Sequence, residues 1–455
     1  MEFPIFQVPY LGNGMTIALN AVLHLIIAQG ITTGVITMIA LAEYIGFKKS
    51  SEHWENFARQ LLKPTIVIVT GAGSITGVGI WFITSALSPK GIGLMLRIFF
   101  WPWFVEWLAF AVEVIVILLY FFTWEKWTGE KKKKHIRMGF AYSGLAIFSA
   151  FLITGILGFM LTSDGWPWNR SFWSAFFNPS FPPQLFLRLG IAFSLGSVFA
   201  SAYLVLVRHE TGFRKEALRF FGKIALVFLA LALVSTWWYF SVVPSRFKTH
   251  AVFSVLTSHF SQHPEFFWIL NILGVIALLL FSLVALRGSI FSSKVLVIPA
   301  ILFFCGFVTE YERVREFIRG PFLLPGYLYS NQVQLDESLF WKNDGTLKNS
   351  YWYSQAGSSE DTVAQGTYLF GQNCSTCHTM GGLNDIKDRV QGRSEDGIYV
   401  ILGNTHQMVP FMPPFSGNDG ERRALSAFLY QLANGQIKIE EPSRFLILSR
   451  EDKNE

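Results

Sequence analysis

The sequence has little charge. Only 15% of its 455 residues are Asp, Glu, Lys or Arg, whereas 51% are hydrophobic and the mean hydropathy is +0.38. This composition excludes an ordinary soluble globular protein and indicates that most of the chain lies in lipid. The formal net charge of +6 does not indicate nucleic-acid binding, because most Lys and Arg residues stand in short runs between long apolar segments.

Cysteine is also scarce. Three cysteines leave no disulfide framework, and Cys305, inside an apolar run, is expected to be a small core residue. The N-terminus lacks a basic leader and a small-residue cleavage site, and its first apolar stretch is too long for a signal-peptide core. We therefore expect the first helix to serve as both targeting signal and anchor.

Eight apolar stretches are long enough to cross a bilayer, which takes about 20 residues. They lie near residues 15–44, 64–87, 98–123, 139–162, 185–208, 222–243, 266–286 and 295–312. Every second loop between them is basic, with Lys48, Lys49, Arg59 and Lys63, then Lys131 to Lys134 and Arg137, then Arg214, Lys215, Arg219 and Lys223, and finally Arg287 and Lys294. The positive-inside rule makes these loops cytoplasmic, so the N-terminus and the chain after about residue 313 are predicted to lie on the extracytoplasmic side.

The predicted fold is therefore all-α: a polytopic membrane helix bundle followed by a small helical domain. We expect the bundle at residues 1–325 and a polar, partly packed connector at 326–360, where Pro, Gly, Asn and Ser alternate with Tyr and Trp. A compact helical domain is expected at 361–435, followed by a charged tail at 436–455 without evident chemistry.

A haem-attachment motif stands near the C-terminus, in Cys374-Ser375-Thr376-Cys377-His378. Two thiols one helical turn apart can bond to the two vinyl groups of one haem, and the adjacent His378 then faces the iron. A zinc knuckle would need a second cysteine pair, which the sequence lacks. We therefore predict one covalent haem c, whose attachment on the outer side of the membrane agrees with the predicted topology.

The sixth ligand of this iron is expected from the loop before the last helix. Met412, in Phe411-Met412-Pro413, lies there, and the arrangement looks like a class I cytochrome c, in which a Met followed by Pro is the distal ligand. Met408 and His406 lie in the same loop and stay open as alternatives. A small cytochrome c domain by itself indicates electron transfer rather than catalysis.

Ionisable residues inside spanning helices are costly and are candidates for functional sites. They are His24, Glu43, Glu106, Glu113, Arg188 and Glu310. Glu43 lies near a helix end, where we expect it to reach water.

For the others, structural roles compete with functional ones. His24 can be a packing residue or a haem ligand. Glu106 and Glu113, seven residues apart, share one helix face and can relay protons or pair with a neighbouring helix. Glu310 and Arg313 can form an interfacial ion pair.

Two of these positions resemble the large subunit of cytochrome bd oxidase. That family has a His in an A-x-x-H-F/L-like segment of its first helix, here Ala21-Val22-Leu23-His24-Leu25, and a late Glu-Tyr-Gly-Arg, here Glu310-Tyr311-Glu312-Arg313. Weaker similarities are Ile75-Thr76-Gly77 and Asn178-Pro179. The resemblance covers residues 1 to about 325, and the cytochrome c domain replaces the family's ninth helix.

The resemblance implies two high-spin b haems and a hetero-oligomer with a second, homologous membrane subunit. His24 would ligate the oxygen-reactive haem and Glu310 its partner haem, with Arg313 near a haem propionate or the oxygen site. Glu106 and Glu113 would correspond to proton-path carboxylates, although the family spaces that pair eight apart.

This sequence departs from the family at the low-spin haem and the quinol site. Leu187, beside Arg188, stands where the family has a His ligand, and Asn271 stands where it has a Met ligand. The quinol-binding loop is reduced to about 243–264, although its three histidines can be solvated or ligate a haem or metal: His250, His259 and His263. These losses and the gained haem c suggest that electrons enter through haem c.

The favoured function is a bd-like terminal oxidase subunit that takes electrons from an extracytoplasmic donor, a c-type cytochrome or another redox protein, and reduces oxygen to water. One alternative is an electron-transfer subunit of a larger respiratory complex without oxygen chemistry. The other is a quinol dehydrogenase that feeds haem c.

Overall fold

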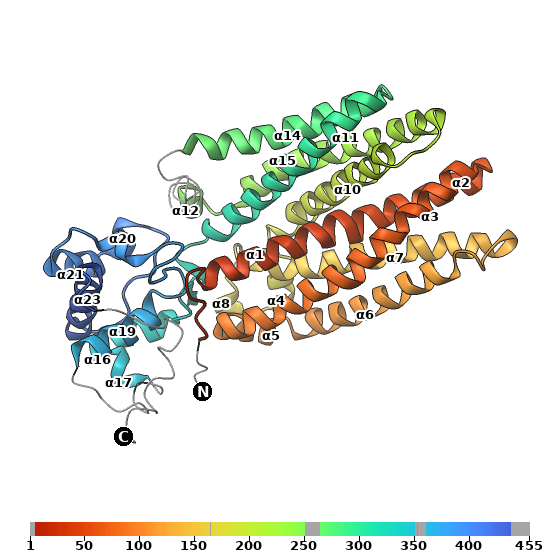
Figure 1. Cartoon of the computed structure of the whole chain (residues 1–455). Helices are drawn as coiled ribbons and strands as arrows, with labels where there is room; N and C mark the ends of the chain where they lie inside the picture. Colours follow the sequence, from red (N-terminus) through yellow and green to blue (C-terminus); the bar gives the residue numbers. More distant parts are fainter. Residues whose placement is uncertain (1–4, 164, 251–263, 351–352, 354–360, 438–455) are drawn as a thin grey trace, which may run out of the picture.

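The computed structural model describes residues 5–163, 165–250, 264–350, 353 and 361–437. Long helices run side by side in a bundle, and a small helical domain covers one end of it (Figure 1). Within the described residues eight helical segments are long and apolar enough to cross a membrane, as predicted. The eighteen C-terminal residues of the predicted charged tail lie outside the described residues.

The first two spans each contain a π-helical stretch. The first span consists of α1 (Asn13–Leu25), η1 (Ile26–Val35) and α2 (Ile36–Lys49), and the second of α3 (Glu52–Val67), η2 (Ile68–Gly73) and α4 (Ser74–Leu87). The two π-helical stretches, η1 and η2, contact each other. Such stretches are rare and frequently occur at functional sites, and η1 begins two residues after His24.

The remaining spans are regular α-helices joined by short elements. The spans are α6 (Phe100–Thr123), α7 (Lys132–Phe159), α10 (Phe181–Leu206), α11 (Thr211–Val242), α14 (Pro264–Leu286) and α15 (Ile290–Phe317). Between them lie α5 (Pro89–Ile98), η3 (Gly129–Lys131), α8 (Trp166–Asn169), α9 (Phe172–Phe176) and α12 (Ser245–Lys248).

Helix α10 is the most buried span of the bundle. It crosses η1 so closely that a Cβ on Gly34 would stand 2.2 Å from the carbonyl oxygen of Ala192. Only glycine permits this approach, because any side chain would collide with the neighbouring backbone. The close crossing fixes the first span, which carries His24, against the centre of the bundle.

The basic loops lie at the end of the bundle opposite the small domain, and we call this the basic end (Figure 1). Ion pairs tie these loops together: Lys49 binds Glu216 at 2.5 Å, and Arg59 binds Glu125. The basic loops that alternate along the sequence therefore gather at one end of the molecule, which carries their positive charge.

The segment expected as a connector is largely folded. It contains β2 (Leu328–Tyr329), which pairs antiparallel with β1 (Phe322–Leu324) just before the connector, and the helices α16 (Leu335–Asp344) and α17 (Thr346–Asn349). The amides of Thr346 and Leu347 donate to the buried Glu421 carboxylate at 2.8 and 2.6 Å. These contacts make the connector part of the small domain.

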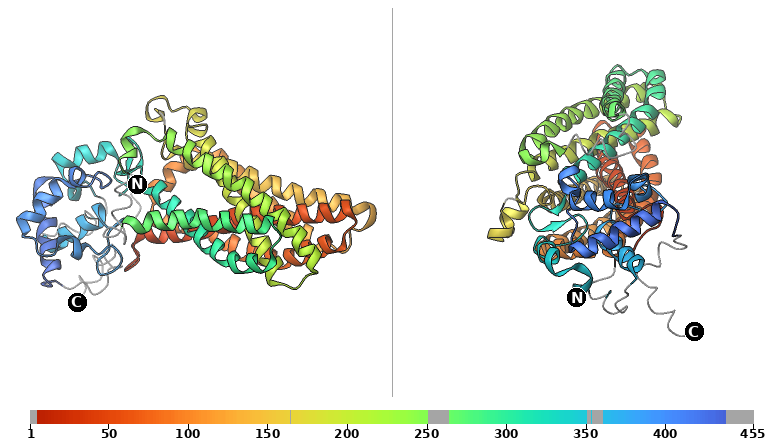
Figure 2. Two further views of the ribbon diagram at one scale, coloured as in Figure 1. Left: turned by 90° about the horizontal axis from the view of Figure 1, so that it is seen from above. Right: turned by 90° about the vertical axis from the view of Figure 1, so that its left-hand side faces the viewer.

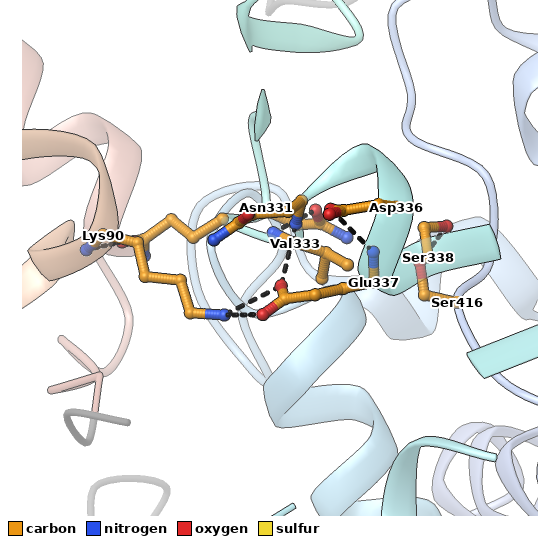
Figure 3. Close-up of polar contacts among 9 residues, drawn as sticks. Lys90, Asn331, Val333, Asp336, Glu337, Ser338 and Ser416 are labelled. Atoms are coloured by element: carbon orange, nitrogen blue, oxygen red, sulfur yellow. Dashed lines mark hydrogen bonds and ion pairs between the residues drawn. The ribbon is translucent and has the colours of Figure 1, made fainter. Parts of the chain in front are cut away.

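The same segment is fixed to the membrane bundle. Lys90 of α5 binds Glu337 of α16 at 3.0 Å (Figure 3). Ser338, the residue after Glu337, forms a 2.8 Å hydrogen bond with Ser416 of the small domain. Gln332 additionally accepts from the Lys90 amide at 3.1 Å. The α16 region therefore joins the two parts of the chain.

The small domain is built on α19 (Thr362–Asn373) and α23 (Asp419–Ala433), which pack against each other. Shorter helices complete it: α20 (Ile386–Val390), α21 (Glu395–Gly403) and α22 (Thr405–Met408). Its core includes Leu369, Phe370, Leu425 and Phe428. Figure 2 shows the domain covering one end of the bundle.

Candidate functional site

The Cys374–His378 motif begins at the C-terminus of α19. The amides of Cys377 and His378 both donate to the Cys374 carbonyl, at 3.1 and 2.9 Å, which folds the motif into a single turn. Both thiols are free. His378 Nδ1 lies 3.4 Å from the Asn384 carbonyl oxygen, so Nδ1 carries the proton and Nε2 is the nitrogen suited to iron.

Electrostatics at His378 also suit an iron ligand. Burial lowers the pKa of its imidazole to about 4. The ring is therefore neutral at physiological pH, and neutral imidazole is the form that coordinates metal. The thiols, the tautomer and the charge of this motif all fit a covalently bound haem.

The loop before α23 offers two methionines with different exposure. The Met408 side chain is 55% exposed, whereas Met412 is half-buried. His406 points its Nδ1 at the Met412 carbonyl oxygen, 3.2 Å away, and so holds the loop. Met412 is thus less exposed than Met408, which suits a distal ligand.

The start of the chain packs across the haem motif, a contact that the sequence gave no reason to expect. Gln7 Nε2 donates to Ser375 Oγ at 2.8 Å, and the Gly14 amide donates to the Thr376 carbonyl at 3.2 Å. A small cavity beside His378 is lined partly by Gln7. The segment preceding α1, the helix that carries His24, therefore packs against the Cys374–His378 motif.

His24 lies at the contact of α1 with α4. Its Nδ1 is 3.1 Å from Thr76 Oγ1, and the Thr76 hydroxyl already donates to the Ala72 carbonyl at 2.7 Å. Thr76 consequently accepts from His24 Nδ1, and Nε2 is then the nitrogen that would face a metal. A Cβ on Gly77 would stand 3.0 Å from His24 Cε1, so Gly77 makes room for the ring. This geometry fits a haem ligand.

The last span ends against the small domain. Glu310 and Arg313 pair at 3.4 Å, and the Arg313 guanidinium lies over the Phe317 ring, 5.6 Å from its centroid. Phe317 meets the edge of Phe411 at a centroid distance of 6.3 Å. A Cβ on Gly320 would stand 2.5 Å from Phe411 Cβ, so the two segments are in close contact.

An ion cluster lies at Arg188, beside the Leu187 position where the resemblance implies a haem-ligating His. Leu187 is fully buried, and Arg188 binds Glu312 at 3.0 Å. Glu312 also binds Arg315 at 2.7 Å. Glu312 stands where the family's Glu-Tyr-Gly-Arg motif has Gly. Two differences from the family motifs, at Arg188 and at Glu312, are therefore in direct contact.

The loop histidines give no metal centre among the described residues. His250 Nδ1 lies 3.2 Å from the Ile318 carbonyl oxygen, and burial lowers the pKa of the ring. His259 and His263 lie outside the described residues. No group of three or more His, Cys, Asp or Glu in the described part of the chain is arranged to hold a metal ion.

The predicted proton-path carboxylates lie on α6. Glu106 Oε1 accepts from Ser149 of α7 at 3.1 Å, whereas Glu113 is buried and its Oε1 has no partner among the described residues. An unpaired buried carboxyl oxygen is costly. Glu113 is therefore poorly explained as a structural residue.

Glu43 differs from its prediction. It does not reach water: its side chain is fully buried and is bound by His135, Tyr120 and Lys132. Those three residues were not identified from the sequence, because Lys132 and His135 stand in a run that indicates only topology. The pairing becomes evident when α2, α6 and α7 are brought together.

Two regions of the chain match protein-family models. Residues 14–246 match cytochrome bd terminal oxidase subunit I, and residues 361–429 match cytochrome c oxidase, cbb3-type, subunit III. The first match includes His24, Glu106 and Glu113 and ends before Glu310. A comparison with curated proteins finds no match.

The fold has a counterpart among solved structures. The chain is similar to the bd oxidase from Geobacillus thermodenitrificans at 19% identity and a TM-score of 0.56, covering 68% of this chain and 85% of that one. At this identity the likeness shows the fold alone. The first family match covers more than half of the chain, so we conclude that this multi-pass membrane protein belongs to the cytochrome bd terminal oxidase subunit I family and carries a fused cytochrome c domain.

Proposed function

We propose that the protein is a terminal oxidase subunit in which haem c passes electrons from an extracytoplasmic donor to haems of the membrane bundle, which reduce oxygen to water. Membership of the bd family supports oxidoreductase chemistry with haem cofactors, and the cytochrome c domain supports electron transfer. The donor is a c-type cytochrome or a similar redox protein.

One observation carries this proposal. The loop that contains Met412 rests on the end of α15, where Phe411 packs on Phe317 and Phe317 lies under Arg313. Arg313 pairs with Glu310. The distal loop of the cytochrome c domain and the proposed Glu310 site are thus joined by consecutive contacts, which suits electron transfer within one chain.

The residues divide into two groups. Cys374 and Cys377 would hold haem c, with His378 and Met412 on its iron. His24 and Glu310 would ligate two high-spin b haems, with Arg313 beside one of their propionates. When bound, these groups supply the one-electron and oxygen chemistry that protein side chains lack. Thr76 fixes the His24 tautomer, and Arg313 neutralises Glu310.

Proton delivery and membrane placement complete the proposal. Glu113 and Glu106 would carry protons through α6 toward the haems. The basic end would face the cytoplasm, with the N-terminus and the cytochrome c domain on the extracytoplasmic side. A second bd-type membrane subunit would cover part of the exposed apolar surface of the bundle.

A quinol donor fits the structure less well. The buried Arg188–Glu312 pair lies beside Leu187, the position where the resemblance implies a haem-ligating His. A buried ion pair is costly to break, because either partner would be left charged in an apolar surrounding. Electron entry through haem c needs no such rearrangement.

The test is a haem inventory and a donor assay on the purified protein. We expect covalent haem c, non-covalent b haems, oxygen consumption with a reduced c-type cytochrome, and a carbon monoxide shift in the reduced spectrum. Six-coordinate haems without a carbon monoxide shift, together with no oxygen consumption, would indicate the electron-transfer subunit instead. Reduction of the haems by quinol alone would support the quinol dehydrogenase.

A further inference from the structure

Glu43 is the centre of a buried charged cluster at the basic end. Its Oε1 atom lies 2.6 Å from His135 Nδ1 and 2.9 Å from Lys132 Nζ, and its Oε2 accepts from the Tyr120 hydroxyl at 2.6 Å. Glu43 and His135 are both 0% exposed. The cluster joins three spans, because Glu43 belongs to α2, Tyr120 to α6, and His135 and Lys132 to α7.

The surroundings of His135 define its protonation. Nδ1 faces the Glu43 carboxylate, and Nε2 lies 2.8 Å from the Tyr120 carbonyl oxygen. Both ring nitrogens thus face acceptors, and only an imidazolium donates from both. The ring stacks on Tyr120 and meets the edge of Trp124, and the Lys132 ammonium binds the same Glu43 oxygen as His135 Nδ1.

The cluster is connected to solvent through Lys132. The Lys132 side chain is 9% exposed and binds Glu55 at 3.3 Å as well as Glu43. Glu55 belongs to α3 and its carboxylate is partly exposed. Glu55, Lys132 and Glu43 therefore form a continuous polar connection from the surface into the bundle.

The opposite side of the cluster faces a series of polar side chains along α6 and α7. These helices are neighbours, and each places a polar residue on their common side every seven positions. On α6 they are Glu106, Glu113 and Tyr120, and on α7 they are His135, Tyr142 and Ser149. Ser149 donates to Glu106 at one end of the series and Tyr120 stacks on His135 at the other, and Glu113 and Tyr142 stand between these two contacts on α6 and α7.

Gly139 of α7 lies between the layer of Tyr120 and His135 and the layer of Glu113 and Tyr142. A Cβ on Gly139 would stand 3.0 Å from the Tyr120 hydroxyl, and the buried Ser143 donates to the Gly139 carbonyl at 3.1 Å. Seven helical residues span about 10 Å, a distance that a proton crosses through intervening hydroxyls and water.

We infer that the Glu43–His135 pair is a proton-loading site that supplies Glu113. The inference rests on the proposed function only in one respect, namely that the protons are consumed in the reduction of oxygen. A purely structural cluster would need neither a connection to solvent on one side nor a series of proton-carrying groups on the other.

The proton balance is simple. The pair, a carboxylate and an imidazolium, releases one proton toward Tyr120 and Ser143 and becomes a carboxylate with a neutral imidazole. One proton from solvent, arriving past Glu55 and Lys132, restores the imidazolium. No electrons move at this site, and each proton released inward is one proton taken up from the basic end.

The experiment measures proton uptake when the detergent-purified holoprotein is reduced without oxygen, using a pH-indicator dye in a stopped-flow instrument. The variants are Glu43→Gln and the milder Tyr120→Phe, which keeps the ring stacked on His135. The matched control is Glu216→Gln, which breaks the Lys49–Glu216 pair at the same end of the bundle.

We expect both test variants to slow proton uptake by at least about tenfold, as for loss of a positioned proton-transfer group, with haem content and haem c reduction unchanged. The control should match wild type. Wild-type proton uptake in Tyr120→Phe with full haem content would overturn the inference, as would equal slowing in Glu216→Gln.

This measurement separates the inference from the proposed function. If wild type takes up protons on reduction but consumes no oxygen, the proposed function fails and the loading site stands. If wild type consumes oxygen while both test variants keep wild-type proton uptake, the loading site fails and the proposed function stands.

Discussion

Each end of the bundle has one set of contacts that bears on the proposals, and the two sets differ in kind. At the end covered by the cytochrome c domain, aromatic rings join one part of the chain to another, as Phe411 and Phe317 do. At the basic end, ionisable groups are bonded directly to one another around Glu43. Packed rings keep two redox groups a short distance apart, which favours electron transfer. Hydrogen-bonded hydroxyls, carboxylates and imidazoles favour proton transfer, because a proton moves along hydrogen bonds. Under the two proposals, the molecule would separate electron transfer and proton transfer by position.

The largest effect is expected from removing the haem c attachment. Cys374→Ser with Cys377→Ser should eliminate covalent haem, because neither serine can form a thioether bond, and donor-driven oxygen consumption should fall to background. Haem staining of denatured protein and an oxygen electrode measure both. Cys305→Ser, at the thiol in the last span, is the control and should retain both; full activity in the double variant would refute an inlet through haem c.

Next in size is the loss of the Thr76 contact to His24. Thr76→Val keeps the shape but removes the acceptor of His24 Nδ1, and it should cost about 10–100-fold in haem affinity or activity, as for partners of metal-ligating His. Haem content on titration with a haem scavenger measures this. Thr70→Val, whose hydroxyl bonds only Ile66 of its own helix in the described structure, should behave as wild type.

A smaller effect is expected at the ring contact between the two parts of the chain. Phe317→Leu and Phe411→Leu should each loosen the docked loop, and a double-mutant cycle should give a coupling energy of about 0.5–1.5 kcal/mol, the range for aromatic pairs. Flash-initiated electron transfer from haem c and thermal unfolding provide the readouts. Additive effects would show that the rings do not act together.

The smallest effect is expected at the partly exposed Lys90–Glu337 pair. Lys90→Met should destabilise the docked domain by about 0.2–1 kcal/mol, the usual range for exposed ion pairs. Limited proteolysis in the connector measures this at low and high salt. A difference that persists at high salt would assign Lys90 a role other than charge pairing, because screening removes exposed pairs.

The sequence predicted elements that depend on local patterns. Eight spans follow from apolar length, and the haem motif follows from the spacing of two cysteines and a histidine. The triplet around Thr76 was noted as a similarity, but its bond to His24 depends on how α1 meets α4. Glu43 was placed in water because its position near a helix end is visible in the sequence, whereas its partners come from other helices. The α16 region was expected to be polar and only partly packed, because its contacts with Lys90, Ser416 and Glu421 come from distant parts of the chain.

The N-terminal segment over the haem motif has a consequence for biogenesis. Gln7 and Ser375 bond across 368 positions. Contacts between such distant residues form late, because a long loop must be ordered first. Under the proposed function, haem would be attached while the N-terminal segment is still away from the motif. The docked segment would then act as a seal on a finished cytochrome, and a tag or fusion placed immediately before it would interfere with assembly more than one at the C-terminus.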